Sequence, residues 1–191
     1  DGTMTGHNTD VTGFMAGFAA CGIGLAGKRT VLIGAGGAAR AALWGLLRSG
    51  VSSVCIGVRN LAKGKALCTD FAADGTLAVY CFDDPHFRDV LCTADIVVQT
   101  TPIGMSPQTD AMPPVDPAAI SPSAAVYDLI YTPAETAFLR AAAAHGCTTI
   151  NGETMLVMQG AEAFYLWTGV RPNTDLMQRA LREELARREG A

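Results

Sequence analysis

The feature that most constrains this chain is a glycine-rich turn between an apolar run and an alanine-rich stretch. The run Val31-Leu32-Ile33 has the length of a buried strand, and the small residues of 34–39 follow it at once. In such a strand–turn–helix unit, the first glycine permits a tight turn and the second lets a phosphate approach the backbone. Unpaired N–H groups at the start of the helix then face the anion. Ordinary turns also use glycine, but this order predicts a nucleotide site at Gly34, Ala35, Gly36, Gly37 and Ala38.

Short apolar runs alternate with helical periodicities along most of the chain. We expect strands over residues 29–33, 53–58, 78–82, 96–99, 125–129 and 148–151. We expect helices after Thr9 and over residues 37–49, 61–71, 84–91, 135–144, 154–168 and 174–188, and a proline-rich surface excursion over 106–122. This alternation is typical of parallel sheets. The predicted fold is therefore α/β, a Rossmann-like doubly wound, mostly parallel six-stranded sheet with helices on both faces.

Several candidate ligand contacts follow directly after predicted strands. Ligands on doubly wound sheets bind beyond the carboxyl ends of the strands. The glycine turn, Arg59, residues 100–105, residues 129–131 and Gly152 all come after strand ends. We therefore expect these segments to converge at one edge of the sheet.

The end of the second predicted strand indicates which dinucleotide would bind. NAD sites usually place a carboxylate there, which accepts hydrogen bonds from the ribose hydroxyls. Here Arg59 and Asn60 occupy this place, Lys63 follows one helical turn later, and no carboxylate appears before Asp70. A guanidinium suits a 2′-phosphate and can stack on adenine. NADP is therefore favoured over NAD, the alternative being that Arg59 is an ordinary solvated arginine.

Charge and composition exclude several classes of partner. The formal net charge is −4, and lysines and arginines form no basic stripe, so nucleic acid is not expected. No apolar run is long enough to span a membrane. The six cysteines contain no C-x-x-C pair, and most lie in apolar segments, which predicts reduced core thiols in a cytoplasmic protein. These cysteines are Cys21, Cys55, Cys68, Cys81, Cys92 and Cys147. The three histidines do not cluster, so no metal site is expected.

Five stretches of the chain resemble one family, the C-terminal, NADP-binding part of shikimate dehydrogenase. These are Gly6-His7-Asn8-Thr9-Asp10 with Gly13-Phe14, and residues 34–40, 101–105, 127–131 and 151–164. Dinucleotide-binding dehydrogenases in general share only the second stretch, so the likeness is specific. One motif departs from the family. Its phosphate clamp reads Asn-Arg-Thr, whereas this chain has Val58-Arg59-Asn60, which keeps only the arginine.

The resemblance implies a role for each matching residue. Asp10 would be the catalytic aspartate that holds the reacting hydroxyl of shikimate beside a lysine. Tyr131 and Gln159 would contact the substrate. Thr101, Leu129, Gly152 and Met155 would contact the cofactor. Plainer interpretations remain open: Asp10 as a helix-leading carboxylate, Gln159 as an exposed polar position, Tyr131 as the close of a loop, and Met105, Met155 and Met158 as core filler.

The resemblance also implies an activity and a domain organisation. The activity is the NADP-dependent, reversible reduction of 3-dehydroshikimate to shikimate. The family's substrate lobe, with its lysine, precedes the Asn8-Thr9-Asp10 motif, and neither Lys28 nor Lys63 replaces that lysine. We expect residues 1–24 to be a linker helix, 25–153 the NADP-binding domain, and 154–191 helices that pack toward the missing lobe. Such a chain would be inactive alone, and its exposed apolar face would favour a homodimer.

Two other functions and one further prediction stand beside this interpretation. The first alternative is a quinate/shikimate dehydrogenase that uses NAD, and the second is a non-catalytic NADP-binding module. In the last predicted helix, the charged residues are expected to form a solvated face with i,i+4 pairs rather than a site. They are Arg179, Arg182, Glu183, Glu184 and Arg187.

Overall fold

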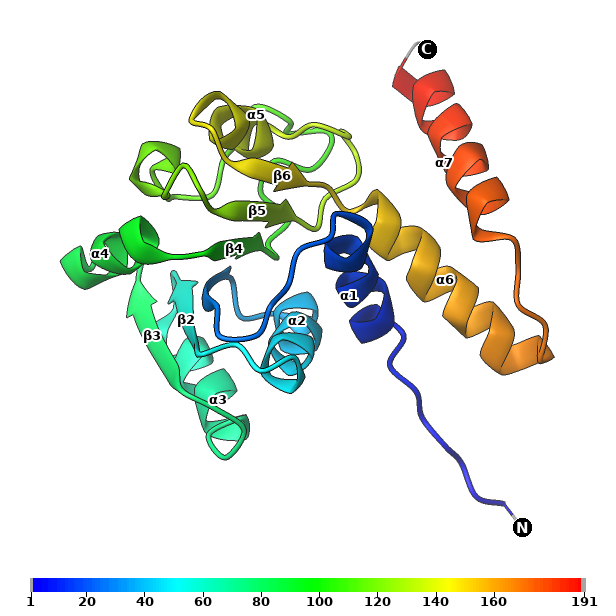
Figure 1. Cartoon of the computed structure of the whole chain (residues 1–191), viewed down its shortest axis with the longest axis horizontal. Coiled ribbons are helices and arrows are strands. Elements are labelled where there is room, and N and C mark those ends of the chain that lie inside the picture. The colour runs from blue at the N-terminus through cyan, green and yellow to red at the C-terminus, as the bar shows by residue number, and fades with distance from the viewer. Residues whose placement is uncertain (1, 190–191) are drawn as a thin grey trace.

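A six-stranded, wholly parallel sheet forms the centre of the computed structural model, which describes residues 2–189 (Figure 1). Its strands are β1 (Arg29–Ile33), β2 (Ser53–Val58), β3 (Leu77–Cys81), β4 (Ile96–Gln99), β5 (Ala125–Asp128) and β6 (Thr148–Ile150), in the order β3-β2-β1-β4-β5-β6. The helices are α1 (Asp10–Ala20), α2 (Gly37–Arg48), α3 (Leu61–Asp70), α4 (Pro85–Thr93), α5 (Ala137–Ala144), α6 (Glu153–Thr168) and α7 (Thr174–Glu189), with a 3-10 turn η1 (Pro117–Ala119). The predicted doubly wound α/β fold is confirmed.

Strand residues alternate between two buried layers. Leu32, Ile56 and Val98 lie in a core shared with α1, α2 and α3, whereas Val31 and Val97 lie in a second core with α4 and α5. Each of these five side chains is 0% exposed. Because both faces are covered, the strands read as continuous apolar runs rather than as alternating ones. Burial of each such side chain contributes roughly 1.5–3 kcal/mol.

The order of the strands reverses at β1, and ligands on such sheets bind beside this point of reversal. β1 pairs with β2 on one side and with β4 on the other. The chain leaves β1 and β2 toward one face and reaches β4 from the other, so a crevice opens at the carboxyl end of β1. The glycine-rich turn occupies this position.

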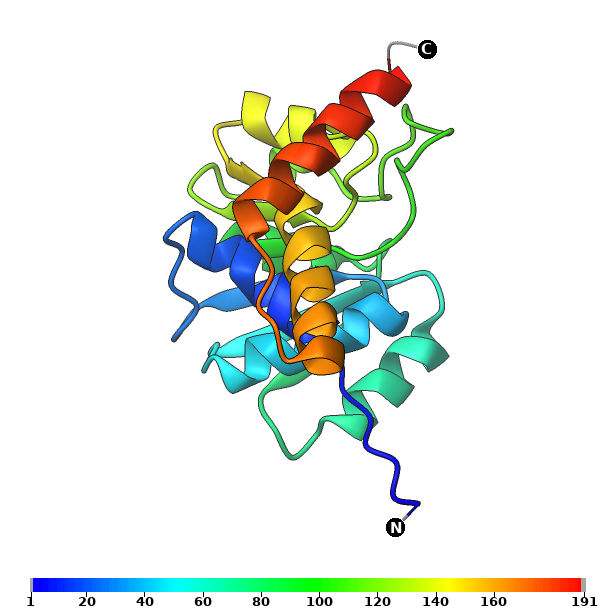
Figure 2. The same cartoon turned by 90° about the vertical axis from the view of Figure 1, so that its right-hand side faces the viewer.

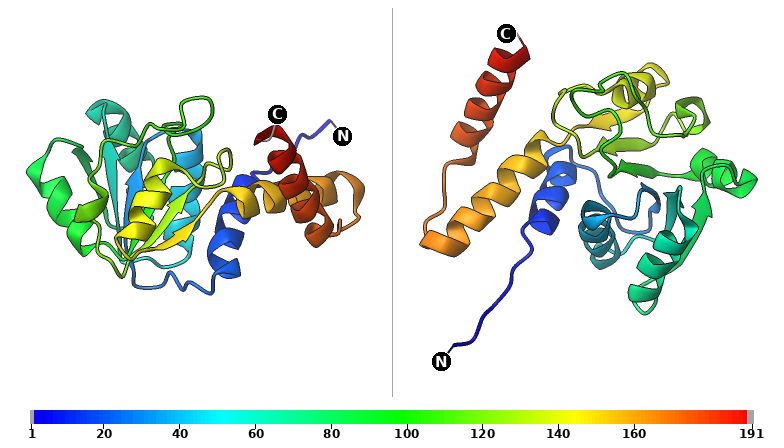
Figure 3. Two further views of the ribbon diagram at one scale, coloured as in Figure 1. Left: turned by 90° about the horizontal axis from the view of Figure 1, so that it is seen from above. Right: turned by 180° about the vertical axis from the view of Figure 1, so that it is seen from behind.

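Helix α1 lies directly against α6, and three views of the chain show this pair at one end of the sheet (Figures 1, 2 and 3). Two glycines allow the close approach. A Cβ on Gly13 would overlap the carbonyl oxygen of Met155, and a Cβ on Gly17 would overlap the hydroxyl of Tyr127. Phe14 stacks on the Tyr127 ring with centroids 5.3 Å apart. The first residue of α1, Asp10, is thereby fixed beside α6.

Helices α6 and α7 extend beyond the sheet (Figure 3), and α7 differs in one respect from its prediction. On the solvated face Glu184 pairs with Arg187 at i,i+3 and with Arg188 at i,i+4. Arg182 is exposed as well, but its Nε lies 2.9 Å from the carboxylate of Glu153 on α6. Charge periodicity within one helix cannot reveal a partner on another helix.

Two other predictions need correction. All six cysteines are free, but Cys21 and Cys92 are exposed, so they are not core thiols. Cys55 and Cys147 are buried, and burial raises the pKa of the Cys55 thiol to about 12. The proline-rich excursion is only partly on the surface, because Ala119 and Ile120 are buried under α5. None of the described helices is long and apolar enough to cross a membrane.

Candidate functional site

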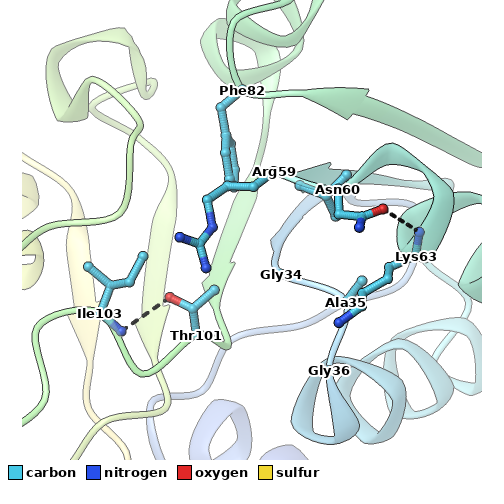
Figure 4. Close-up of a pocket in the computed structure, with 10 residues that line it drawn as sticks. Gly34, Ala35, Gly36, Arg59, Asn60, Lys63, Phe82, Thr101 and Ile103 are labelled. Carbon is cyan, nitrogen blue, oxygen red and sulfur yellow. Dashed lines mark hydrogen bonds between the residues drawn. The ribbon is translucent and has the colours of Figure 1, made fainter.

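Two cavities flank the first turn of α2 at the carboxyl edge of the sheet. The first, of about 220 Å³, is lined by Gly34, Ala35, Gly36, Val58, Arg59, Asn60, Lys63, Phe82, Thr101 and Ile103 (Figure 4). The second, of about 260 Å³, is lined by Asp10, Ala38, Leu129, Tyr131, Gly152, Met155, Leu156 and Gln159. The expected convergence of these segments at one edge therefore occurs. Of the five residues 34–38 that were predicted to contact the nucleotide, only Gly37 lines neither cavity.

The glycine turn leaves the backbone open toward the first cavity. Gly34 has a φ of +109°, a conformation that favours glycine, and a Cβ there would lie 2.7 Å from the Thr100 hydroxyl. A Cβ on Gly36 or Gly37 would meet nothing within 4 Å. Gly36 caps α2 without a side-chain hydrogen bond, so the first N–H groups of this helix keep no side-chain partner. Such a helix start attracts an anion.

The outer end of the first cavity is cationic. Arg59 is exposed, and Figure 4 shows its guanidinium extended toward the loop that carries Thr101 and Ile103. Within residues 2–189 no hydrogen bond or ion pair involves the Arg59 side chain. No carboxylate is among the described residues that line this cavity. Asp70 lies elsewhere, in an ion pair with Arg40.

Asn60 has a second role, because its side chain begins α3. The Asn60 Oδ1 accepts a hydrogen bond from the Lys63 backbone N–H at 3.2 Å, which caps the helix. This contact uses one lone pair of the amide oxygen and leaves the amide nitrogen of Asn60 free to donate to a ligand. The cap also fixes the turn between Arg59 and Lys63, and both residues line the cavity, with the Arg59 guanidinium toward Thr101 and the Lys63 side chain toward Ala35 and Gly36 (Figure 4).

A buried glutamine shapes the opposite wall of the first cavity. Gln99 is 0% exposed, and its Nε2 donates hydrogen bonds to the carbonyl oxygens of Thr101 at 2.9 Å and Ile103 at 3.1 Å. The Thr100 hydroxyl donates to the carbonyl of Ile33 at 2.7 Å. These bonds tie the loop after β4 to the end of β1. The position of Thr101 is therefore set by buried groups.

The second cavity gathers the residues for which the resemblance implied substrate contact. Asp10 is exposed at the start of α1, and Tyr131 has an exposed fraction of 37%. Gln159 is half-buried, and its Oε1 accepts a hydrogen bond from the Thr9 hydroxyl at 3.5 Å. Gln159 is thus not an exposed polar position. One carboxylate, one phenol and one amide face a common space, which suits a small polyhydroxylated ligand.

Close backbone packing forms the floor of the second cavity. Gly152 donates its N–H to the carbonyl of Ile130 at 2.9 Å, and a Cβ on Gly152 would overlap the carbonyl oxygen of Leu129. Met155 packs on the adjacent core. Met105, by contrast, is 45% exposed and lines neither cavity.

A fully buried carboxylate supports the loop that carries Leu129 and Tyr131. Asp128 is 0% exposed and accepts hydrogen bonds from the Thr136 hydroxyl at 2.8 Å and the Ile130 N–H at 3.1 Å. Burial raises its pKa to about 6, and these two hydrogen bonds oppose the shift. Sequence reasoning did not single out this residue.

Four lining residues were also missed. Phe82 follows β3, Val58 ends β2, Ile103 lies in the loop after β4, and Leu156 lies on α6. Phe82 is the last residue of the predicted strand 78–82, and this place at a strand end was the available signal. It was overlooked because an aromatic residue at a strand end is also common in a core.

Two models of known protein families match this chain. The Shikimate / quinate 5-dehydrogenase family matches residues 19–105, and the Shikimate 5′-dehydrogenase C-terminal domain matches residues 152–182. The shikimate dehydrogenase (NADP(+)) of Moorella thermoacetica is 40% identical over 192 residues, which cover 100% of this chain and 65% of that protein. The chain thus spans about two thirds of the length of this relative.

Solved structures agree with the sequence comparison. Shikimate 5-dehydrogenase from Listeria monocytogenes, in complex with shikimate and NAD, has a TM-score of 0.88 at 30% identity, over 95% of this chain and 65% of that one. The shikimate 5-dehydrogenase of Thermus thermophilus, in complex with NADP(H) and shikimate, has a TM-score of 0.80 at 35% identity, over 93% and 63%. The likeness extends over nearly all of the described fold.

Proposed function

Because the chain belongs to the family of shikimate / quinate 5-dehydrogenases, we propose that it is the NADP-binding portion of a shikimate dehydrogenase. The reaction is the reversible, NADP-dependent reduction of 3-dehydroshikimate to shikimate. One observation carries this proposal: a phosphate-accepting helix start separates a cationic cavity from a cavity that holds a carboxylate. A dinucleotide that crosses the start of α2 would reach both.

The residues of the first cavity fit the phosphates of NADP. The tight turn at Gly34, the open backbone at Gly36 and the uncapped start of α2 would hold the pyrophosphate. Arg59, which has no partner within residues 2–189, would hold the 2′-phosphate, with Lys63 adding charge. Ala35, Gly37, Ala38, Asn60 and Thr101 would complete the nucleotide contacts.

The second cavity fits the reacting end. NADP, when bound, exchanges a hydride at its nicotinamide ring. Leu129, Gly152 and Met155 would form the wall for that ring. Asp10 would accept a hydrogen bond from the reacting hydroxyl and orient it, while Tyr131 and Gln159 would hold the rest of the substrate. No lysine is among the described residues that line this cavity, so we assign proton transfer to a lysine of a separate substrate lobe.

A separate lobe is also supported by the surface of the last helices. The chain spans 65% of its Moorella relative. Phe164, Trp167, Val170 and Leu176 are exposed, Trp167 by 83%. We propose that residues 1–24 link to this lobe, that 25–153 bind NADP, and that 154–191 pack against the lobe. Without the lobe this apolar face would support a homodimer. The six free cysteines support a cytoplasmic location.

Replacing Arg59 by alanine is expected to remove the preference for NADP. A charge-assisted hydrogen bond contributes about 1.5–3 kcal/mol, so NADP affinity should fall about 10- to 100-fold. NAD affinity should stay within about twofold, because NAD carries no 2′-phosphate. Calorimetric titration of both cofactors into the chain measures this. Arg140→Ala, an exposed arginine on α5, is the matched control. Equal affinity of the unaltered chain for NADP and NAD would contradict the role of Arg59.

Dehydrogenase activity is expected to need the substrate lobe. We expect the chain alone to reduce NADP with shikimate at close to the background rate. Fusion to the substrate lobe of the Moorella relative should raise the rate at least about 100-fold, because general acid–base catalysis contributes that much. Asp10→Asn in the fusion should lose most of the gain. A fully active isolated chain would show this part of the proposal to be wrong.

The second candidate function is a quinate/shikimate dehydrogenase that uses NAD. The Listeria neighbour was solved with shikimate and NAD, and this chain lacks two of the three residues of the family's phosphate clamp. Initial rates of the fusion with shikimate or quinate, and with NADP or NAD, separate the two enzymes. Cofactor binding without any turnover in the fusion would instead favour the non-catalytic NADP-binding module.

A further inference from the structure

A buried carboxylate joins the C-terminal helix to the start of α6. Glu153, the first residue of α6, is 7% exposed. Its Oε2 accepts hydrogen bonds from Arg182 Nε at 2.9 Å and from Gln178 Nε2 at 3.1 Å, both on α7. Arg182 itself is largely exposed, with a side-chain exposure of 66%. A cationic partner stabilises a carboxylate this buried, and in this structure α7 supplies one.

The same carboxylate is also connected, through Asn151, to the loop after β5. Its Oε1 accepts a hydrogen bond from Asn151 Nδ2 at 3.2 Å, and that amide group also donates to the carbonyl of Ala134 at 3.0 Å. The Asn151 Oδ1 accepts from the Glu153 backbone N–H at 3.2 Å. Ala134 lies in the loop after β5, which carries Tyr131. An unbroken series of hydrogen bonds therefore runs from α7 to this loop.

Gly152 lies between the two ends of this network and forms part of the cavity wall. Its N–H donates to Ile130 at 2.9 Å, and its Cα packs so closely on the Leu129 carbonyl that no Cβ fits. Any shift of Asn151 or Glu153 must therefore move Gly152 relative to Leu129. Gly152 and Leu129 both line the second cavity and neither lines the first, while the residues that make the network's side-chain hydrogen bonds line neither cavity.

We propose that Glu153 and Arg182 are positioning residues through which α7 fixes the wall of the second cavity. The inference rests on the proposed NADP function, because it assigns the nicotinamide half of the cofactor to that wall. Under this proposal α7 influences the cofactor site without contacting the cofactor. It also predicts that loss of the contact between α7 and Glu153 affects one half of the dinucleotide and spares the other.

Calorimetric titrations of the chain with two ligands distinguish binding at the two halves of the cofactor site. NADP extends across both cavities, whereas 2′,5′-ADP carries only the adenosine end with its 2′-phosphate. We expect Arg182→Ala to weaken NADP binding about 3- to 30-fold, the usual range for a change within a coupling network. Binding of 2′,5′-ADP should change less than about twofold. Arg182→Lys, which keeps the charge, should recover part of the loss.

Three further measurements make the test specific. Arg187→Ala, an arginine of α7 that pairs only with Glu184 among the described residues, is the matched control and should leave both affinities unchanged. Gln178→Ala removes a neutral donor to the same carboxylate and should act in the same direction as Arg182→Ala, but more weakly. Hydrogen exchange of the Gly152 amide should accelerate in Arg182→Ala and not in Arg187→Ala.

The outcomes distinguish this inference from the function on which it rests. Selective loss of NADP affinity with faster exchange at Gly152 supports the inference. Equal weakening of both ligands, or no weakening, overturns it and leaves the NADP function intact. If the unaltered chain bound neither ligand, the proposed function would fail, and the inference with it.

Discussion

The Gly152→Ala variant is expected to lose about 3 kcal/mol of folding free energy and to bind no ligand in the second cavity. An alanine Cβ would overlap the carbonyl group of Leu129 and the carbonyl carbon of Ile130. These are backbone atoms, so relief requires the loop after β5 to move and the Gly152 N–H bond to Ile130 to lengthen. Overpacking of this kind costs about 1–3 kcal/mol, and the weakened hydrogen bond adds to it.

Thermal unfolding followed by circular dichroism measures this loss. For a chain of this size, about 3 kcal/mol corresponds to a fall in Tm of roughly 6–12 °C. Gly160→Ala in the same helix is the matched control, because its Cβ would meet only Met177 Cε at 3.8 Å, an ordinary contact. That variant should be neutral or more stable by about 0.5–1 kcal/mol. Equal Tm values for the two variants would refute the close approach at Gly152.

The Asp128→Asn variant is expected to remove a pH dependence of stability between about pH 4 and pH 6. Burial raises the pKa of Asp128 to about 6, from 3.8 for an ordinary aspartate. In this window the native state holds a proton that the unfolded chain has released, so the Asp128 contribution to stability falls as the pH rises. Above pH 6 the buried charge costs the native state about 3 kcal/mol, and asparagine carries no such charge.

Denaturant unfolding at pH 4 and pH 7 measures the effect as a difference between two proteins. As the pH rises from 4 to 7, the unaltered chain should lose up to about 3 kcal/mol of unfolding free energy relative to Asp128→Asn. Asp95→Asn is the control of opposite sign, because hydrogen bonds from Arg29 lower the pKa of Asp95. Asp95 contributes stability at neutral pH that is lost as the pH falls. A common pH profile for Asp128→Asn and the unaltered chain would exclude an ionised, buried Asp128.

Much of the fold could be predicted because its signals are local. Apolar runs flanked by glycine or polar residues define β1, β2 and β4 to the residue, and the remaining strand boundaries fall within one or two positions. The glycine turn identified the crevice because glycine favours the positive φ of Gly34 and because small residues leave the start of α2 open. Strand ends then predicted which segments meet, since parallel strands share one carboxyl edge.

What escaped prediction depends on contacts between segments far apart in the sequence. Arg182 resembles its solvated neighbours on α7 until Glu153 is placed opposite it, 29 residues away. Asp128 reads as the polar end of a strand, and only the folded loop shows that Thr136 and Ile130 enclose it. Phe82 joins the first cavity because β3 lies at the edge of the sheet next to β2. The three share one cause, which is that each surrounding is set by residues distant in the sequence or by the folded loop rather than by the residue itself.

Under the proposed function, Gly13 and Gly17 would determine that the carboxylate orienting the substrate belongs to the cofactor-binding half of the enzyme. Because these glycines seat α1 against the backbone of α6 and the ring of Tyr127, Asp10 and Gln159 form one rigid unit with the sheet. A second lobe that swings toward the crevice would therefore meet a carboxylate already aligned with the nicotinamide end. Its hinge could open widely to release product without disturbing that alignment, and domain closure would have to place only the lysine.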